Sequence, residues 1–205
     1  EPNHYRAICE AIGLEMTLSY DDFLSRFAGR DERYAMGEMA NELGIEYDEE
    51  LFRKWSKTKS EAYAQFVSEN AEPMPGAVDF VLVVARSLPV GLATGSRRSD
   101  INAALSVLAG GRLEGVFQTI VTSDDVPKPK PHPATYAKAV ENLGFQPNEC
   151  VAFEDSPNGI LSAKGAGLRV IGISAMHGAD KLGEADRVVP DLRGASLDSL
   201  YSWLD

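Results

Sequence analysis

The chain has 205 residues, of which 44% are hydrophobic and 25% are charged, and its formal net charge is −11. This composition is typical of a globular protein, and the acidic balance argues against nucleic acid or an anionic membrane as a partner. The two cysteines, Cys9 and Cys150, show no disulfide framework or zinc spacing, which favours a cytoplasmic location. We expect a monomer or a weak homodimer.

Residues 1–71 are expected to form a helical domain. Apolar residues recur at helical spacing in four segments, residues 5–12, 20–27, 35–43 and 49–69. Asp21 and Asp48 are candidate N-caps of the second and fourth segments. No part of this region has the alternating pattern of a strand.

The sequence changes character at Glu72-Pro-Met-Pro-Gly76, where two prolines and a glycine break the helix and mark a domain boundary. Helical and strand-like segments then alternate through residues 72–205. This alternation predicts an α/β domain in which helices cover both faces of a parallel sheet. The expected strands are residues 90–94, 118–122, 150–153, 169–173 and 187–189, and the expected helices are residues 77–88, 99–108, 133–143, 159–166 and 197–204.

The first motif is Gly91-Leu-Ala-Thr-Gly-Ser-Arg-Arg98, in which an apolar strand ends at Thr94 and a helix begins shortly afterwards. The Thr94 hydroxyl and the backbone N–H groups of Gly95 and Ser96 would lie at the sheet edge, in front of the positive end of that helix. Such a turn can bind an anion. Alternatively, it is an ordinary strand–helix turn in which Ser96 is only an N-cap.

The second motif is Val126-Pro-Lys-Pro-Lys-Pro-His-Pro133. Alternating prolines stiffen the backbone, so a lysine in this loop loses less freedom when it is fixed in place. Lysine is a point charge that proteins often use for phosphate. A solvated proline-rich loop is the alternative, but the position directly after one predicted strand and before a helix favours a binding role.

The third motif is a short apolar strand that ends in the adjacent acids Glu154 and Asp155. Two hard oxygen ligands suit Mg²⁺, although two solvated acids at a strand end are the simpler interpretation of this pair alone. The three motifs each follow a strand of one parallel sheet, so they are expected to meet at its carboxyl edge. Together they predict a phosphate site that contains a metal ion.

In this order, the motifs resemble those of the haloacid dehalogenase superfamily and, within it, the β-phosphoglucomutase-like phosphatases. Thr94 stands at the hydroxyl of the family's second motif, and Glu154-Asp155-Ser156 matches its metal motif. Lys130 matches the family's Lys-Pro-x-Pro pattern better than Lys128 does, because Tyr136 then falls at the expected aromatic position. The resemblance implies a Rossmann-like core, formed by residues 72–205, and a helical cap, formed by residues 1–71.

The resemblance also implies a Mg²⁺-dependent phosphatase that hydrolyses a small phosphorylated metabolite, in particular a sugar phosphate, through an aspartyl-phosphate intermediate. The implied residues are Thr94 and Lys130 for catalysis, Gly95 and Ser96 with them for phosphate binding, Glu154 and Asp155 for the metal, and Arg33 and Lys59 of the cap for the substrate. Arg30 competes with Arg33 for the cap role. As an alternative, each cap residue is simply a surface charge on a helix.

One motif of the family is not in the sequence. The nucleophile is the first aspartate of an Asp-x-Asp motif at the end of the central strand, and Glu1-Pro-Asn-His4 resembles the residues that follow this motif. We therefore expect the first core strand to lie upstream of Glu1. A phosphomutase of the β-phosphoglucomutase type is an alternative function. If the nucleophile is truly absent, a non-catalytic phosphate-binding module is another.

Overall fold

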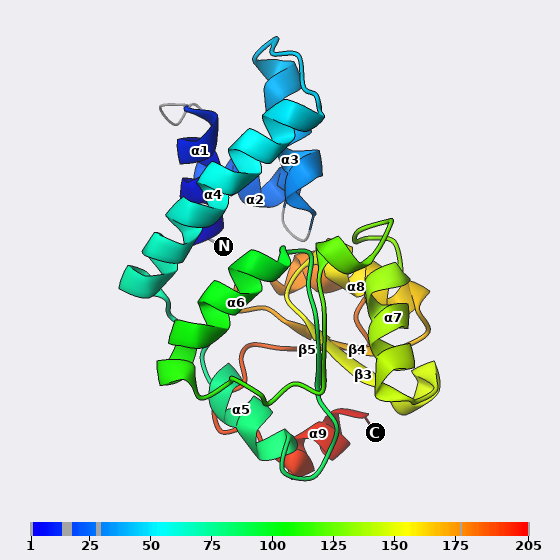
Figure 1. Cartoon of the computed structure of the whole chain (residues 1–205). Helices are drawn as coiled ribbons and strands as arrows, with labels where there is room; N and C mark the ends of the chain where they lie inside the picture. The colour runs from blue at the N-terminus through cyan, green and yellow to red at the C-terminus, as the bar shows by residue number, and fades with distance from the viewer. Residues whose placement is uncertain (1, 14–17, 28–29, 177, 205) are drawn as a thin grey trace.

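The computed structural model describes residues 2–13, 18–27, 30–176 and 178–204. Four helices gather at one end of the molecule (Figure 1): α1 (Pro2–Ile12), α2 (Tyr20–Phe27), α3 (Glu32–Glu42) and α4 (Glu49–Asn70). They enclose an apolar core of their own, which includes Ile8, Phe23, Met36 and Trp55. Helices of this kind owe most of their stability to such packing.

One of the two predicted N-caps is confirmed. The Asp48 carboxylate accepts a hydrogen bond from the Leu51 N–H (2.8 Å), so Asp48 caps α4. The prediction for Asp21 is wrong, because Asp21 lies inside α2. Ser19 caps α2 instead, because its Oγ accepts a hydrogen bond from the Asp22 N–H (3.1 Å).

The rest of the chain alternates between helices and strands, as its periodicity predicts. The strands are β1 (Gly91–Ala93), β2 (Thr119–Val121), β3 (Val151–Glu154), β4 (Arg169–Ile173) and β5 (Arg187–Val189). The helices are α5 (Ala77–Val84), α6 (Arg98–Val107), α7 (Ala134–Leu143), α8 (Pro157–Gly165) and α9 (Leu197–Leu204). Every strand pair is parallel, which confirms the predicted α/β class.

The strands form two sheets rather than one. β1 pairs with β2, and β3, β4 and β5 pair in that order. Alternate residues of the larger sheet face opposite ways, as the pleat requires. Ala152 and Val170 pack towards α7 and α8, whereas Ile171 and Ile173 pack with Phe80 of α5 and with α9.

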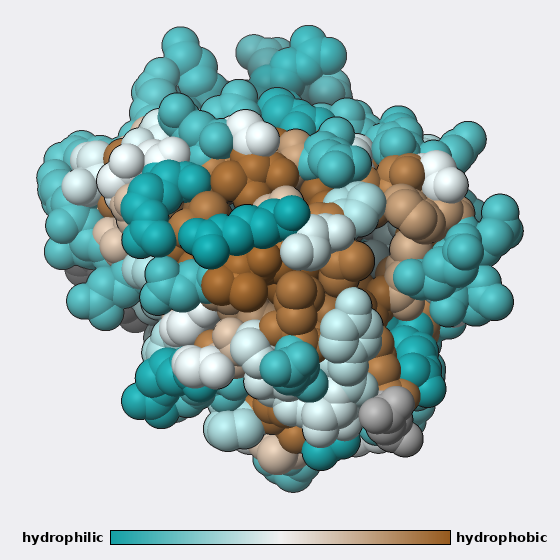
Figure 2. Space-filling model, turned by 90° about the horizontal axis from the view of Figure 1, so that it is seen from below, coloured by the Kyte–Doolittle hydropathy of each residue, from teal (hydrophilic) through white to brown (hydrophobic). Residues whose placement is uncertain are grey.

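Apolar side chains remain open to solvent between these layers. Viewed from the end that carries α5 and α9, they gather in the middle of the surface (Figure 2). Val84, Val151 and Trp203 are half-buried and pack against the core that contains Phe80 and Ile171. In the described part of the chain, no strand pairs with the free edge of β1 or with that of β3. Leu92 of β1 and Phe153 of β3 line the same hollow, so an apolar slot lies between the two sheets.

The linker between the two halves of the chain is held against the α/β half. The Leu192 N–H donates to Pro75 O (3.1 Å), and Gly76 adopts a positive φ of 80°. A Cβ on Gly76 would lie 2.1 Å from the carbonyl carbon of Leu192, so the contact requires glycine. None of the helices in the described ranges is both long and apolar enough to cross a bilayer.

Candidate functional site

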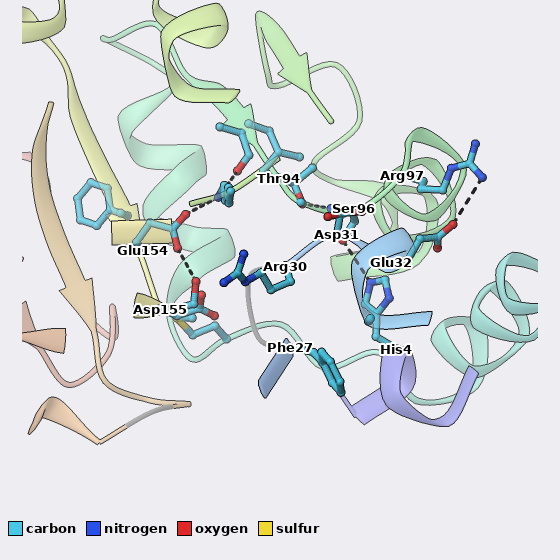
Figure 3. Close-up of a pocket in the computed structure, with 18 of the residues that line it drawn as sticks. His4, Phe27, Arg30, Asp31, Glu32, Thr94, Ser96, Arg97, Glu154 and Asp155 are labelled. Atoms are coloured by element: carbon cyan, nitrogen blue, oxygen red, sulfur yellow. Dashed lines mark hydrogen bonds and ion pairs between the residues drawn. The ribbon is translucent and has the colours of Figure 1, made fainter. Parts of the chain in front are cut away.

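A cavity of about 460 Å³ lies between the four N-terminal helices and the carboxyl ends of β1 and β3. The α/β half contributes Thr94, Lys130 and Asp155 to its wall, and the helical half contributes His4 and Arg30 (Figure 3). The three motifs identified in the sequence therefore meet in one place. Within each sheet the parallel strands end at one edge, and the carboxyl ends of both sheets border this cavity.

Hydrogen bonds from two of its backbone N–H groups hold the turn after β1 in place. The Thr94 N–H donates to Val121 O (2.9 Å), which continues the pairing of β1 with β2, and Thr94 Oγ1 accepts the Ser96 N–H (3.1 Å). The alternative in which Ser96 is only an N-cap is wrong, because Arg97 occupies the N-cap position of α6. Asp124 from the turn after β2 caps this helix by accepting the Arg98 N–H (2.9 Å).

Lys130 lies at the point where the two sheets approach each other. Its ammonium donates to Ala93 O of β1 (3.1 Å) and to Glu154 Oε1 of β3 (2.5 Å), and only 5% of the residue is exposed. Lys128, two residues earlier in the same loop, is exposed. The structure thus brings Lys130, and not Lys128, to the cavity. The Lys130–Pro131 peptide bond is cis.

The Glu154 carboxylate is buried and held by several donors. Tyr136 donates its hydroxyl to Oε1 (2.5 Å), and Ser156 donates its Oγ–H to Oε2 (3.3 Å). Burial, together with the charge of Glu154, raises the pKa of the Tyr136 hydroxyl well above 10, so Tyr136 stays a donor. Tyr136, the aromatic residue expected after Lys130, therefore holds the Glu154 carboxylate by donating a hydrogen bond to it.

Gly159 makes room for this carboxylate, a role that its sequence position did not reveal. It lies in the first turn of α8, where a Cβ would come within 1.9 Å of Glu154 Oε2. The hydroxyl of Ser156 caps the same helix by accepting the Gly159 N–H (3.1 Å). The Ser-Pro-Asn-Gly turn thus caps α8 through Ser156 and leaves space for the Glu154 carboxylate at Gly159.

Asp155 faces the cavity next to this buried cluster (Figure 3). Mg²⁺ binds proteins through one or two carboxylates and takes its other ligands from water and phosphate, so Asp155 with Glu154 beside it fits this ion. Within the described residues, no group of three or more histidine, cysteine or acidic side chains could hold a metal ion.

The two predicted cap residues occupy different surroundings. Arg33 does not border the cavity: its guanidinium pairs with Glu49 (2.9 Å) and lies 3.7 Å from the ring centre of Phe52. Arg30 borders the cavity and points towards Asp155 in Figure 3. Lys59 borders it too, but only 1% of Lys59 is exposed.

His4 connects the helical half to the turn after β1. Its Nε2 lies 3.3 Å from Ser96 Oγ, and its ring lies 4.2 Å from that of Tyr63. Burial, and secondly the positive charge of Lys59, lower the pKa of His4 well below 6.5. His4 is therefore neutral at physiological pH.

This order of motifs around one cavity agrees with the comparison of the sequence with known families. The profile of the haloacid dehalogenase-like hydrolases matches residues 7–173. The chain belongs to the haloacid dehalogenase-like hydrolase family.

Individual members of this family are similar over most of the chain. Protein CbbY of Rhodobacter capsulatus is 30% identical over 195 residues, which are 93% of this chain and 85% of that protein. Validoxylamine A 7'-phosphate phosphatase of Streptomyces hygroscopicus subsp. limoneus is 33% identical over 84% of this chain and 79% of its own length. The crystal structure of CbbY from Rhodobacter sphaeroides has a TM-score of 0.87 at 23% identity and covers 98% of this chain and 92% of its own. This likeness confirms the Rossmann-like fold.

The contact between Gly159 and Glu154 predicts the effect of a single methyl group. Replacing glycine by alanine inside a helix normally stabilises by about 1 kcal/mol. We expect Gly159→Ala to destabilise the haloacid dehalogenase-like fold by about 1–3 kcal/mol, because the methyl group displaces the Glu154 carboxylate. Denaturant unfolding measures the change. Gly183→Ala is the control, since nothing lies within 4 Å of its Cβ. Equal stability of the two variants would contradict the contact.

The lowered pKa of His4 predicts part of the dependence of stability on pH. The unfolded chain takes up a proton near pH 6.5, whereas the folded protein resists protonation at this residue. The stability that neutral His4 contributes is therefore present above about pH 6.5 and is lost as the pH falls below it. Between about pH 7.5 and 5.5, His4→Gln should lose less unfolding free energy than the unchanged protein. Parallel curves for His4→Gln and the unchanged protein would exclude this role of His4.

Proposed function

We propose that this protein is a Mg²⁺-dependent phosphatase that hydrolyses a small phosphorylated metabolite, in particular a sugar phosphate. The observation that carries the proposal is that the Thr94 turn, Lys130 and Asp155 come from three distant segments and border one cavity. The combination of an ammonium, backbone amides and a carboxylate suits a phosphate group with its metal ion. The name of the Streptomyces relative, a phosphatase, supports this reading.

Each residue of the site has a distinct role in this proposal. The Thr94 hydroxyl and the N–H groups of Gly95 and Ser96 bind phosphate oxygens at the end of β1. The Lys130 ammonium neutralises the negative charge that grows on the phosphoryl group during transfer. Asp155, with Glu154 beside it, would hold Mg²⁺, which would supply further positive charge to the phosphate group.

The nucleophile is proposed to come from an additional strand in the slot between β1 and β3. Two parallel sheets with free edges that face one slot, and apolar side chains left open around it, support a further parallel strand there. An aspartate at the carboxyl end of such a strand would lie between Thr94 and Asp155. Its carboxylate would attack phosphorus while the bond from phosphorus to the ester oxygen breaks and the alcohol leaves. Water would then hydrolyse the aspartyl-phosphate intermediate and release inorganic phosphate.

We propose that residues 1–71 form the cap that selects the substrate. The helices close the cavity on the side opposite the strand ends, which would exclude water from the phosphate. Arg30 is the best-placed cap residue for the distal groups of a substrate, because it points into the cavity. Arg33 is a weaker candidate, because its guanidinium already pairs with Glu49.

The acidic chain and its two free cysteines, Cys9 and Cys150, support a cytoplasmic protein without nucleic acid or membrane partners. We propose that it acts as a monomer or a weak homodimer.

The proposal predicts hydrolysis that depends on magnesium. The native protein should release inorganic phosphate from members of a panel of pentose and hexose phosphates. EDTA should stop the release, and added Mg²⁺ should restore it. Asp155→Asn should lower turnover by a factor of about 100 or more, because Asp155 is the metal ligand that faces the cavity. The control is Asp79→Asn, an exposed acid that pairs only at the surface with Arg112 (3.4 Å).

The products of this assay separate the proposed function from its alternatives. Free phosphate indicates a phosphatase. An isomerised sugar phosphate would replace this proposal with a phosphomutase. Binding of phosphate and Mg²⁺ by the native protein with no turnover of any ester would indicate a non-catalytic binding module.

The position of Lys130 predicts that its loss affects both turnover and stability. Lys130→Ala leaves the buried Glu154 carboxylate without its cation, which should cost about 3–5 kcal/mol of unfolding free energy. Lys130→Met combined with Glu154→Gln removes both charges, so it should recover stability but not turnover. Lys128→Ala, in the same loop, should change neither. A stable and active Lys130→Ala variant would remove Lys130 from the site.

A further inference from the structure

Lys59, Asp100 and Glu32 form a buried charge cluster where the helical half meets α6. Lys59 and Asp100 are each 1% exposed, and their charged groups are in direct contact. The Lys59 ammonium also lies 3.0 Å from Glu32 Oε2. Charged side chains are almost never this buried unless they are paired. The two carboxylates therefore already satisfy the charge of Lys59.

The spacing of the residues on α4 explains why they face α6. Lys59, Ser60 and Tyr63 follow Ser56 by three, four and seven residues, so they share one face of the helix. Asp100 lies in the first turn of α6, and its Oδ1 accepts a hydrogen bond from Ser60 Oγ (3.2 Å). The contact between α4 and α6 is therefore polar and specific in register.

Arg97 extends this contact to the phosphate-binding turn. It directly follows Ser96, and its guanidinium lies 2.5 Å from Ser56 Oγ and 3.5 Å from Glu32 Oε1. The same guanidinium pairs with Asp124 in the turn after β2 (3.0 Å). Figure 3 shows Arg97 and Glu32 side by side at the end of the cavity where Ser96 lies. Ser56 and Glu32 of the helical half thus hold the turn after β1 through their contacts with Arg97.

We propose that Lys59 is a positioning residue and not a substrate contact: with Asp100 and Glu32 it locks α4 to α6 and so fixes the phosphate-binding turn beneath the cap. A substrate could recruit the Lys59 ammonium only by taking it away from two buried carboxylates. Asp100 does not border the cavity, so it does not contact a substrate there. An effect of replacing Asp100 on turnover would therefore act through the contact between α4 and α6.

Three variants test the proposal: Lys59→Met, Asp100→Asn and the two combined. Each single variant leaves an unbalanced charge in a buried place, whereas the double variant removes both charges of the pair. Asp79→Asn, which breaks an exposed ion pair in the α/β half, is the control. The readouts are hydrogen exchange in peptides that cover residues 56–63 and 94–100, and kcat and KM for a sugar phosphate that the native protein hydrolyses.

The lock predicts that both single variants increase exchange in both segments and lower turnover by about tenfold or more. The double variant should recover unfolding free energy, because neither charge of the pair is left unbalanced, but its exchange in both segments should stay raised, because the contact that joins α4 to α6 is gone. An Asp100→Asn variant that behaves like the control while Lys59→Met loses turnover would overturn the proposal. If the single variants do not fold, the double variant decides: raised exchange in both segments supports the lock, and exchange like that of the unchanged protein overturns it.

The turnover readout rests on the proposed function, but hydrogen exchange does not. If the unchanged protein hydrolyses no phosphate ester, the proposed function fails, and the exchange data alone decide whether the cluster locks α4 to α6.

Discussion

The ion pair between Lys130 and Glu154 is the contact on which the rest of the structure depends. No strand pairing joins the two sheets in the described residues, and the Lys130 ammonium spans them by contacting the last residues of both β1 and β3. Tyr136 and Gly159 both serve this pair, one by donating to the carboxylate and the other by leaving space for it. The same two side chains therefore organise the fold and the proposed phosphate site.

The interface between the helical half and the α/β half has a different character from either core. Its central contacts are charged or polar, namely the cluster of Lys59 with two acids, the guanidinium of Arg97 and the pairing of His4 with Ser96. Polar interfaces of this kind are common between parts of a chain that move relative to one another. A few specific pairs, rather than a large apolar surface, fix the helices over the turn after β1.

The sequence predicted most of this fold because its periodic patterns are strong. The strands at residues 169–173 and 187–189 have the bounds expected, whereas α5 ends at Val84, four residues earlier than the apolar pattern suggests. The meeting of Thr94, Lys130 and Asp155 was predicted from one parallel sheet, whereas in the structure these residues follow strands of two sheets whose carboxyl ends border the same cavity. The partners of Lys59 could not be predicted, because Asp100 lies 41 residues away and nothing local links them. The pairing of Arg33 with Glu49 could not be predicted either, because these residues lie on different helices and no local pattern links them.

A crystal structure of the native protein grown with inorganic phosphate and Mg²⁺ would show whether the three motifs bind one phosphate. We expect one phosphate at the carboxyl edge of the sheets, within hydrogen-bond distance of the Thr94 hydroxyl, the Gly95 N–H and the Lys130 ammonium, with the metal ion on Asp155. Phosphate bound elsewhere, or a cavity that stays free of phosphate at saturating concentration, would rule out this site.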